Sequence, residues 1–411
     1  MKPPLIILIT FLAAAISAGP FNDARAAISC GGRHWVGAWG ASSAYAPPPG
    51  LSDQTVRIIA QAHAAGTRVR LRLSNRFGAG PVRLEAARVG LSAGGADVQP
   101  GSDQEVLFSK QGTVTIPRGK EILSDAVSLR VHTLQELVIS VYAKGPTGPA
   151  TAGWSSQDDT VAYIASGSRV LDSSGAAFAA SRLIPFVNRV DVFASRRAAA
   201  IAALGDSITA GLGAELARPA GARNTRWPDF LARRLLARHL PLSPVNAGIG
   251  GNRLRVNAPV YFPAFGPRGF NRLRPDVLDL PGVTDAVIAL GINDVSAPSA
   301  GVAGRIITAR RRIAKRLRRR RIHVLEATLT PALGVIGDHA DKVRRTVNRW
   351  IRTHHRSRVV DFDRALRDPD RPRYLRAKYD SGDHIHPNAA GYERLARAIR
   401  LSQLRGNRCT R

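Results

Sequence analysis

Three residue types that together perform acyl transfer occur in the second half of the chain. Ser207 ends an apolar run in "AAAIAALGDSITAGLG" (198–213), and Asp383 and His386 stand three residues apart in "SGDHIHPN". A serine hydroxyl becomes a nucleophile when a histidine takes its proton, and a carboxylate orients the imidazole and stabilises its charged form. We therefore predict Ser207 as nucleophile, His386 as general base and Asp383 as its partner. The alternative for an isolated serine is that Ser207 only caps a helix.

Acyl transfer also needs hydrogen-bond donors aimed at the developing oxyanion. The Ser207 N–H is one candidate, because amides at the start of a helix lack partners. The N–H of Gly251 in "NAGIGGN" is a second, because glycine lets the backbone approach a ligand closely; Gly250 is its rival. The side-chain amide of Asn293 in "GIND" is the third.

The rhythm of the chain from about residue 196 predicts the elements that position these groups. Short apolar runs alternate there with helical stripes, and the runs cover residues 198–204, 244–248, 285–291, 322–329 and 358–362. Such alternation is typical of a parallel sheet covered by helices on both faces. Thr225 is expected to cap the helix after the first run, and the last helix is expected after Pro387. Ser207, Gly251 and Asn293 follow the ends of the first three runs, and Asp383 and His386 come well after the fifth; open α/β sheets bind ligands at this edge.

The first half of the chain has a different pattern. Between about residues 35 and 195, segments such as "RVRLRLSN" (68–75), "TVTIPRGK" (113–120) and "ELVISVYA" (136–143) alternate apolar and polar residues between turn signals. This pattern predicts an all-β sandwich or jelly-roll-like domain over 27–195, followed by the catalytic domain over 196–411.

The four quoted motifs carry a family resemblance. In order, "GDSI", "NAGIGGN", "GIND" and "DHIHPN" resemble the four blocks of the SGNH, or GDSL-type, esterase and lipase family across residues 198–400. The resemblance implies a flavodoxin-like three-layer fold, no cofactor, Ser207, Asp383 and His386 as catalytic residues, and Ser207, Gly251 and Asn293 as the oxyanion hole. Gly251 stands in the family position, five residues after Asn246. The departure from the motif is Ile for Leu after the serine.

Two further comparisons refine this resemblance. Thr209 stands where the G-x-S-x-G nucleophile elbow needs a second glycine, which argues against an α/β-hydrolase. "WVGAWGASS" and "RLRLSNRFG" in the first half are similar to a secreted branch of SGNH hydrolases with an N-terminal β-domain, whose members include arylesterase-like proteins. That similarity implies an acylated carbohydrate or a small ester as substrate.

The ends of the chain indicate export. Lys2, the apolar stretch after it and "ARA" (24–26) form the pattern of a signal peptide over residues 1–26. The alternative is an uncleaved anchor, but no later run is apolar enough to span a membrane. We therefore expect a secreted or periplasmic protein. Cys30 and Cys409, at the two ends of the mature chain, are predicted to pair in that compartment; otherwise both are unpaired thiols.

The formal net charge of +30 comes mostly from arginine. The densest run is "ARRRIAKRLRRRR" (309–321), where Ile306, Ala309, Ile313 and Leu317 form a buried helical stripe and the arginines are expected on the solvated face. The basic residues are spread along the chain and are not interleaved with aromatic residues. We therefore predict no specific nucleic-acid partner, although attraction to polyanions follows from charge alone.

The predicted function is a secreted serine ester hydrolase, without metal or cofactor, acting on a small-molecule or polysaccharide-linked ester. An O-acyltransferase with the same site and a non-catalytic polyanion-binding protein are the alternatives. A metal site would need His384 beside Asp383 and His386, with "GDHAD" (337–341) as a further donor. Asp206 and Asp294 are expected in supporting or turn roles, and Asp380 is a weaker partner for His386. Trp35, Trp39 and Trp154 are expected in the core of the β-domain rather than on a ligand platform.

Overall fold

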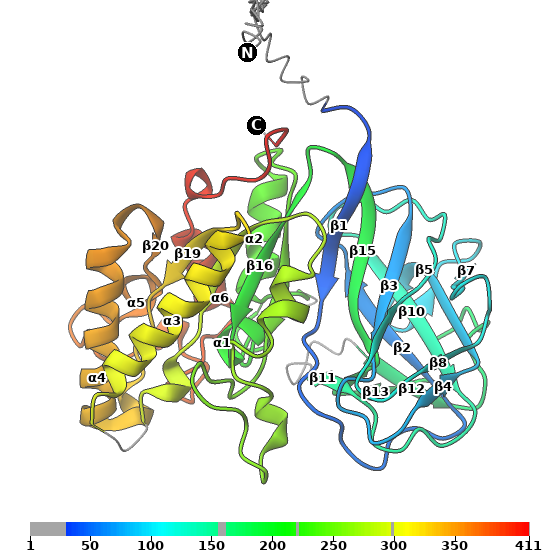
Figure 1. Cartoon of the computed structure of the whole chain (residues 1–411), viewed down its shortest axis with the longest axis horizontal. Helices are drawn as coiled ribbons and strands as arrows, with labels where there is room; N and C mark the ends of the chain where they lie inside the picture. The colour runs from blue at the N-terminus through cyan, green and yellow to red at the C-terminus, as the bar shows by residue number, and fades with distance from the viewer. Residues whose placement is uncertain (1–29, 155–161, 219–221, 297–299, 411) are drawn as a thin grey trace, which may run out of the picture.

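The structure of the 411-residue chain is a computed structural model. It describes residues 30–154, 162–218, 222–296 and 300–410. The expected signal peptide (1–26) lies outside the described residues, and so does the side chain of Trp154. An all-β part precedes an α/β part, and the two lie side by side (Figure 1). Among the described residues, no helix has the length and apolarity needed to cross a bilayer.

The all-β part contains a four-stranded sheet in the order β1-β15-β3-β9 and a seven-stranded sheet in the order β13-β12-β2-β10-β5-β6, with β7 paired to β5. The predicted alternation is clearest in β3, where Val69, Leu71 and Leu73 are fully buried. The strands are β1 (Arg33–Gly40), β2 (Gln54–Gln61), β3 (Val69–Ser74), β4 (Val82–Leu84), β5 (Ala86–Gly94), β6 (Asp97–Val98), β7 (Gln104–Glu105), β8 (Val114–Ile116), β9 (Glu121–Leu123), β10 (Glu136–Ala143), β11 (Ala152–Trp154), β12 (Ala162–Ser166), β13 (Ala179–Ser181), β14 (Leu183–Pro185) and β15 (Val187–Ser195).

The α/β part is built on a five-stranded parallel sheet in the order β17-β16-β18-β19-β20. All seven residues of β16 are buried, as expected for a central strand covered on both faces. Each of the five predicted runs overlaps one of these strands, with bounds that differ by up to a few residues. The strands are β16 (Ala199–Gly205), β17 (Leu242–Gly248), β18 (Val283–Ala289), β19 (His323–Ala327) and β20 (Val359–Val360).

Two groups of helices accompany this sheet. Helices α2 and α5 each pack against α6, whereas α3 packs against α4; α3 and α4 lie on the viewer's side in Figure 1. The helices are α1 (Ser207–Ala210), α2 (Trp227–Leu236), α3 (Val302–Arg319), α4 (Leu333–His354), α5 (Phe362–Leu366) and α6 (Ala389–Ala398). The final helix begins after Pro387, as predicted.

The predicted cap of α2 is wrong. The Thr225 hydroxyl donates to the Ala214 carbonyl at 2.7 Å instead of to the helix. Arg226 is the N-cap, and its backbone N–H donates to the carboxylate of Asp229 at 2.9 Å. A carboxylate in the first helical turn can accept this bond and also favours the positive end of the helix dipole.

The expectation that all arginines of α3 face solvent is also wrong at one position. Arg310 is fully buried, where its guanidinium donates to the carboxylate of Glu326 at 2.9 Å and to three backbone carbonyls. The predicted stripe is otherwise present, since Ile306, Ile313 and Leu317 are buried. A buried guanidinium is tolerated here because its donors are used.

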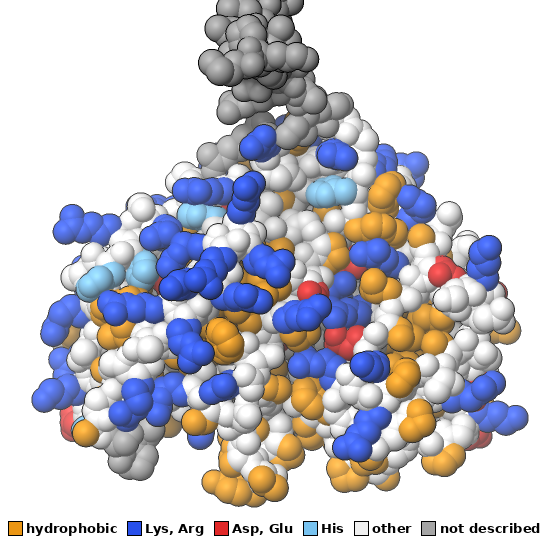
Figure 2. Space-filling model, in the orientation of Figure 1, with side chains coloured by type: hydrophobic (Ala, Val, Ile, Leu, Met, Phe, Trp, Pro, Cys, Tyr) orange, Lys and Arg blue, Asp and Glu red, His pale blue; other side chains and the backbone are white. Residues whose placement is uncertain are grey.

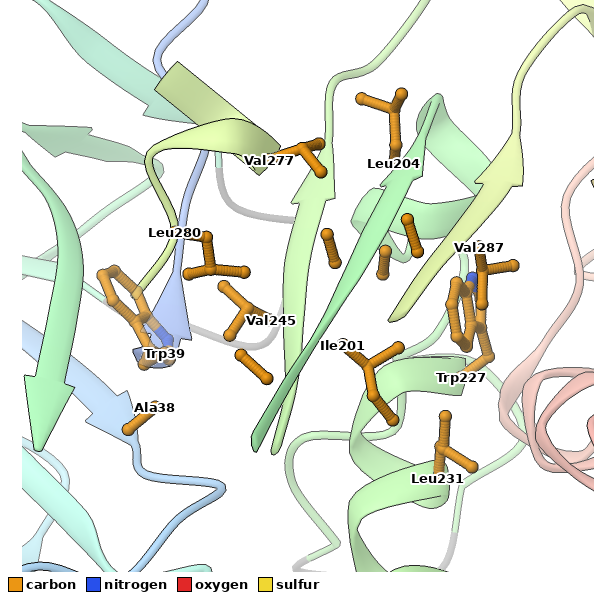
Figure 3. Packing of buried hydrophobic residues seen from close by; sticks show 14 of the residues in the cluster. Ala38, Trp39, Ile201, Leu204, Trp227, Leu231, Val245, Val277, Leu280 and Val287 are labelled. Atoms are coloured by element: carbon orange, nitrogen blue, oxygen red, sulfur yellow. The ribbon is translucent and has the colours of Figure 1, made fainter. Parts of the chain in front are cut away.

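The two parts of the chain share one buried hydrophobic cluster. Strand β1 lies against the edge strand β17, and the Gly37 N–H donates to the Pro281 carbonyl at 3.0 Å. Figure 3 shows Trp39 and Leu280 beside Val245 of β17. Trp39 is 4% exposed, so it belongs to the core as predicted. Trp35 is half-buried and lies against Phe193, with ring centroids 5.4 Å apart.

His63 joins the all-β part to the α/β part. Its Nδ1 lies 2.6 Å from the carbonyl oxygen of Pro244, and its Nε2 lies 3.4 Å from the carboxylate of Asp229. Burial alone would raise the pKa of Asp229, but Arg226 and His63 outweigh burial and hold that pKa well below its ordinary value. This polar contact therefore lies inside the interface between the two parts.

The predicted disulfide between Cys30 and Cys409 is present, with a Cα–Cα distance of 5.4 Å. It joins residues 379 positions apart, at the start of the all-β part and the end of the α/β part. In the chain-entropy account, closing so large a loop stabilises the folded state by about 6 kcal/mol.

Candidate active site

Ser207 is the first residue of α1, directly after the buried end of β16. Asp206 is the N-cap, and its carboxylate accepts a hydrogen bond from the Ile208 N–H at 3.1 Å. Helix α1 is short, ending at Gly211 in the left-handed conformation. The turn lifts the Ser207 side chain to the end of the sheet, where it is 6% exposed. Its backbone N–H lies in the first turn, where amides have no acceptor within the helix.

A continuous chain of hydrogen bonds joins the three predicted catalytic residues. The Oγ atom of Ser207 lies 2.8 Å from Nε2 of His386, and Nδ1 of His386 lies 2.5 Å from Oδ2 of Asp383. These contacts let the imidazole accept the serine proton on one nitrogen while its other nitrogen donates to a carboxylate. Residues separated by 179 positions in the sequence meet here.

Asp383 has the electrostatics of a permanently ionised partner. Its Oδ1 accepts the backbone N–H groups of Ile385 at 3.1 Å and His386 at 2.8 Å. Burial alone would raise the pKa of Asp383, but the hydrogen bonds from the His386 imidazole and from these amides hold the pKa well below its ordinary value. The Asp383 carboxylate is therefore ionised throughout the pH range in which histidine side chains ordinarily titrate.

The neighbouring pair of Asp380 and His384 is separate from this chain. Nδ1 of His384 lies 2.7 Å from Asp380, and the His384 backbone N–H donates to the same carboxylate at 3.0 Å. His384 has a positive φ of 64°, which turns its side chain out of the regular alternation. Asp380 therefore bonds to His384 and not to His386.

Gly251 and Asn293, the other two oxyanion candidates, are connected through Asn252. The Asn293 side-chain amide donates to the Asn252 carbonyl at 3.0 Å, and a primary amide retains a second N–H. Gly251 has a φ of 67°, whereas Gly250 is not in the positive-φ region. A Cβ at position 251 would also collide with the ring of Phe265. The backbone at Gly251 therefore requires glycine, which Gly250 does not.

Asp294 makes a second connection between the segment after Gly251 and the turn that contains Asn293. Its carboxylate accepts the backbone N–H groups of Leu254 at 2.8 Å and Arg255 at 3.1 Å. Burial raises the pKa of Asp294. Its place agrees with the supporting role expected of it.

The sequence reasoning did not identify Arg272, which lies at the centre of these loops. Its fully buried guanidinium donates to the carbonyls of Gly205 at 2.6 Å and Ala247 at 2.7 Å. It also donates to the side-chain oxygen of Asn252 at 3.0 Å and to Asp276 at 2.7 Å. Arg272 thus connects the ends of β16 and β17 to Asn252, the residue after Gly251. Nothing in its sequence context distinguishes it from the other arginines.

The metal alternative finds no support in this geometry. No group of three His, Cys, Asp or Glu side chains within the described ranges is arranged to hold a metal ion. Asp341 of "GDHAD" is instead buried against Arg344 and Arg373, at 2.7 and 2.8 Å.

Asp206→Asn is expected to make stability less sensitive to alkali. Burial raises the pKa of Asp206 to about 7. Since that folded-state pKa exceeds the unfolded value, the ionised carboxylate costs stability progressively as pH rises from about 4 to about 7. Asparagine caps a helix as well as aspartate does. Urea unfolding should therefore show the variant gaining about 1–3 kcal/mol over the parent between pH 5 and pH 8.

Asp361→Asn is the matched control for this experiment. Asp361 is the N-cap of α5, but Arg352 outweighs the effect of its burial and lowers its pKa. Asp361→Asn should therefore lose stability above the ordinary carboxylate pKa. A pH-independent difference for Asp206→Asn would contradict the raised pKa.

Comparison with known proteins gives one family model and several solved structures that are similar to about half of this chain. The family model of the GDSL-like lipase/acylhydrolase family matches residues 203–394. Among solved structures, the aryl esterase of M. smegmatis is 18% identical, with a TM-score of 0.37, over 49% of this chain and 96% of its own. An acetyl xylan esterase is 19% identical, with a TM-score of 0.35, over 48% and 96%. A GDSL-like lipase from Bacteroides thetaiotaomicron is 19% identical, with a TM-score of 0.36, over 51% and 88%. No curated protein sequence matches this chain.

The α/β part is thus the domain of a carboxylic ester hydrolase. Residues 203–394 form a GDSL-like lipase/acylhydrolase domain.

Proposed function

We propose that this protein is an exported serine ester hydrolase that works through an acyl-enzyme. The observation that carries the proposal is the hydrogen-bond chain from Ser207 through His386 to Asp383, with contacts of 2.8 and 2.5 Å. General-base activation of a serine requires this arrangement, in which the hydroxyl bonds to one imidazole nitrogen and the carboxylate bonds to the other.

In the proposed reaction, Oγ of Ser207 attacks the ester carbonyl while Nε2 of His386 takes its proton. The tetrahedral oxyanion accepts hydrogen bonds from the Ser207 and Gly251 N–H groups and from the Asn293 amide. His386 then donates the proton to the departing alcohol, and Ser207 keeps the acyl group. A water molecule, deprotonated by His386, attacks the acyl-enzyme and releases the carboxylic acid and the free serine.

The proposal also covers the architecture and the compartment. We infer a flavodoxin-like three-layer domain over 196–411, because its sheet has the strand order 2-1-3-4-5 of that fold when its strands are numbered along the chain. We infer a separate β-sandwich domain over 27–195. Export is supported by the signal-like residues 1–26 and by a disulfide of the kind that persists in oxidising compartments.

Pre-steady-state hydrolysis of p-nitrophenyl acetate tests the acyl-enzyme. If deacylation is slower than acylation, p-nitrophenolate should appear in a burst equal to the enzyme concentration. Adding sugar acceptors and analysing the products separates hydrolysis from O-acyl transfer, since a transferase would yield the acylated sugar. Turnover that persists after His386→Gln at the parent rate would contradict the proposal.

Asn293→Ala is expected to lower kcat by about 10²–10³ with little change in KM. The reason is that an oxyanion donor bonds more strongly to the transition state than to the bound ester. Asn271→Ala is the control, because Asn271 is an exposed asparagine whose amide donates only to Asn257. A loss below tenfold in Asn293→Ala would remove Asn293 from this role.

A further inference from the structure

A stripe of basic residues on α3 faces the segment 254–278 across a groove. Arg305, Arg312, Arg316 and Arg319 follow one another at intervals of seven, four and three positions, and Lys315 stands four positions before Arg319, so they share one face of the helix. Two adjoining cavities of ≈ 220 and ≈ 470 Å³ lie along this face, and both are lined by Phe270 and Arg312. Figure 2 shows lysine and arginine side chains gathered over α3.

The groove is strongly cationic. No acidic residue lines it, and its basic lining residues are Arg255, Arg268, Arg274, Arg305, Arg312, Lys315, Arg316 and Arg319. Arg274 lies 3.5 Å from Asp279. Within the described part of the chain, Arg312, Lys315, Arg316 and Arg319 form no ion pair with a carboxylate. Like charges three or four residues apart destabilise a helix, so the stripe works against folding.

The buried arginine of the same helix provides a contrast. Arg310 is paired with Glu326 and bonded to backbone carbonyls, so it serves the fold. Within the described ranges, Arg312, Lys315, Arg316 and Arg319 form no ion pair with a carboxylate. Their field is concentrated in a concave surface with low-dielectric walls. Their arrangement is that of a site for an anion.

The groove adjoins the candidate active site. Leu254 and Arg255 line one end, and their backbone N–H groups donate to Asp294, the residue after the oxyanion candidate Asn293. From Arg305 to Arg319 the helix rises by about 21 Å at 1.5 Å per residue. This length fits several successive charges on an extended chain rather than one small anion.

We propose that this groove binds a linear anionic polysaccharide bearing carboxylate groups. Guanidinium groups form paired hydrogen bonds with carboxylates, and Arg312, Arg316 and Arg319 present three of them in succession along α3. A single-stranded nucleic acid would need several exposed aromatic rings for base stacking. The groove has one ring, Phe270, which already lies 5.0 Å from the Arg312 guanidinium. That the bound polymer also carries the ester cleaved at Ser207 rests on the proposed function; the binding does not.

The test compares two quadruple variants of the full chain that each remove four positive charges. The groove variant carries Arg312→Gln, Lys315→Gln, Arg316→Gln and Arg319→Gln. The control carries Arg118→Gln, Arg130→Gln, Arg182→Gln and Arg196→Gln, all exposed residues of the all-β part or its end. Fluorescence anisotropy measures binding of labelled polygalacturonate oligomers, with neutral xylan oligomers and a single-stranded oligonucleotide of equal length as comparison probes.

The groove variant should bind polygalacturonate at least tenfold more weakly than the parent. Its slope of log affinity against log salt should become shallower by about 2–3, because fewer counterions are released. The control variant should remain within about twofold of the parent, and xylan should not bind. Equal losses of polygalacturonate affinity in both variants would overturn the proposal, because binding would then depend on the overall charge of the protein. Tighter, groove-dependent binding of the oligonucleotide would overturn it in favour of nucleic acid.

Hydrolysis of p-nitrophenyl acetate separates this proposal from the proposed function. Neither quadruple variant changes a residue of the proposed catalytic machinery, so both should retain the parent rate on this small ester. Groove-dependent binding in a protein without esterase activity would contradict the proposed function alone. Esterase activity without groove-dependent binding would contradict the groove alone.

Discussion

Ser207→Ala is expected to abolish both ester hydrolysis and labelling by a fluorophosphonate. In serine hydrolases the loss of the nucleophile removes at least about 10⁴-fold of the rate, because the oxyanion donors retain only a residual effect. Here the Ser207 hydroxyl bonds to Nε2 of His386 at 2.8 Å. A fluorophosphonate should therefore form one covalent adduct, located on Ser207 by mass spectrometry and absent from the variant.

Ser243→Ala is the matched control for that experiment. Ser243 lies on β17, is also buried, and its hydroxyl has no hydrogen-bond partner among the described residues. It should retain the parent activity and labelling. An adduct on another serine, or no adduct on the folded parent protein, would contradict the assignment of Ser207. The turn after β16 would then be only a helix cap.

Arg272→Met should cost both stability and turnover. The change removes a buried guanidinium from the Gly205 and Ala247 carbonyls and from Asn252, and it leaves the Asp276 carboxylate without this partner. Removing one partner of a buried ion pair costs about 3–5 kcal/mol of unfolding free energy. Urea unfolding measures this loss. Because Asn252 connects Gly251 to Asn293, kcat should fall more than KM rises in the fraction that stays folded.

The adjacent Arg274 provides the control for Arg272. The side chain of Arg274 is 83% exposed, and its ion pair with Asp279 is 3.5 Å long. Arg274→Met should therefore change stability by less than about 0.5 kcal/mol. Arg272→Lys, which keeps the charge but not the forked donors, should recover part of the stability and less of kcat. Equal effects of Arg272→Met and Arg274→Met would contradict the positioning role.

Several parts of the fold and site could be predicted because their signals are local. The alternation of Val69, Leu71 and Leu73 with arginines indicates a strand with one buried face. The wholly apolar run of β16 indicates a strand buried on both faces. The turn at Ser207 and the short spacing of Asp383 and His386 are also visible in the chain itself. The rule that the ends of parallel strands share one edge accounts for the place of Ser207. His386 comes well after β20, beyond α5, and its contact with Ser207 across 179 residues depends on the tertiary structure.

The sequence by itself determined which segments are strands and helices and which residue types are offered to the site. The tertiary structure alone decided what each arginine does. Arg272 joins two strand ends, Arg310 neutralises a buried glutamate, and Arg312, two residues further along the same helix, lines a groove. The same structure placed His63 between the two parts of the chain. Sequence periodicity indicates only which face of a single helix or strand is buried. Whether a charged side chain is buried and paired depends on the carbonyls and carboxylates that distant parts of the chain place around it.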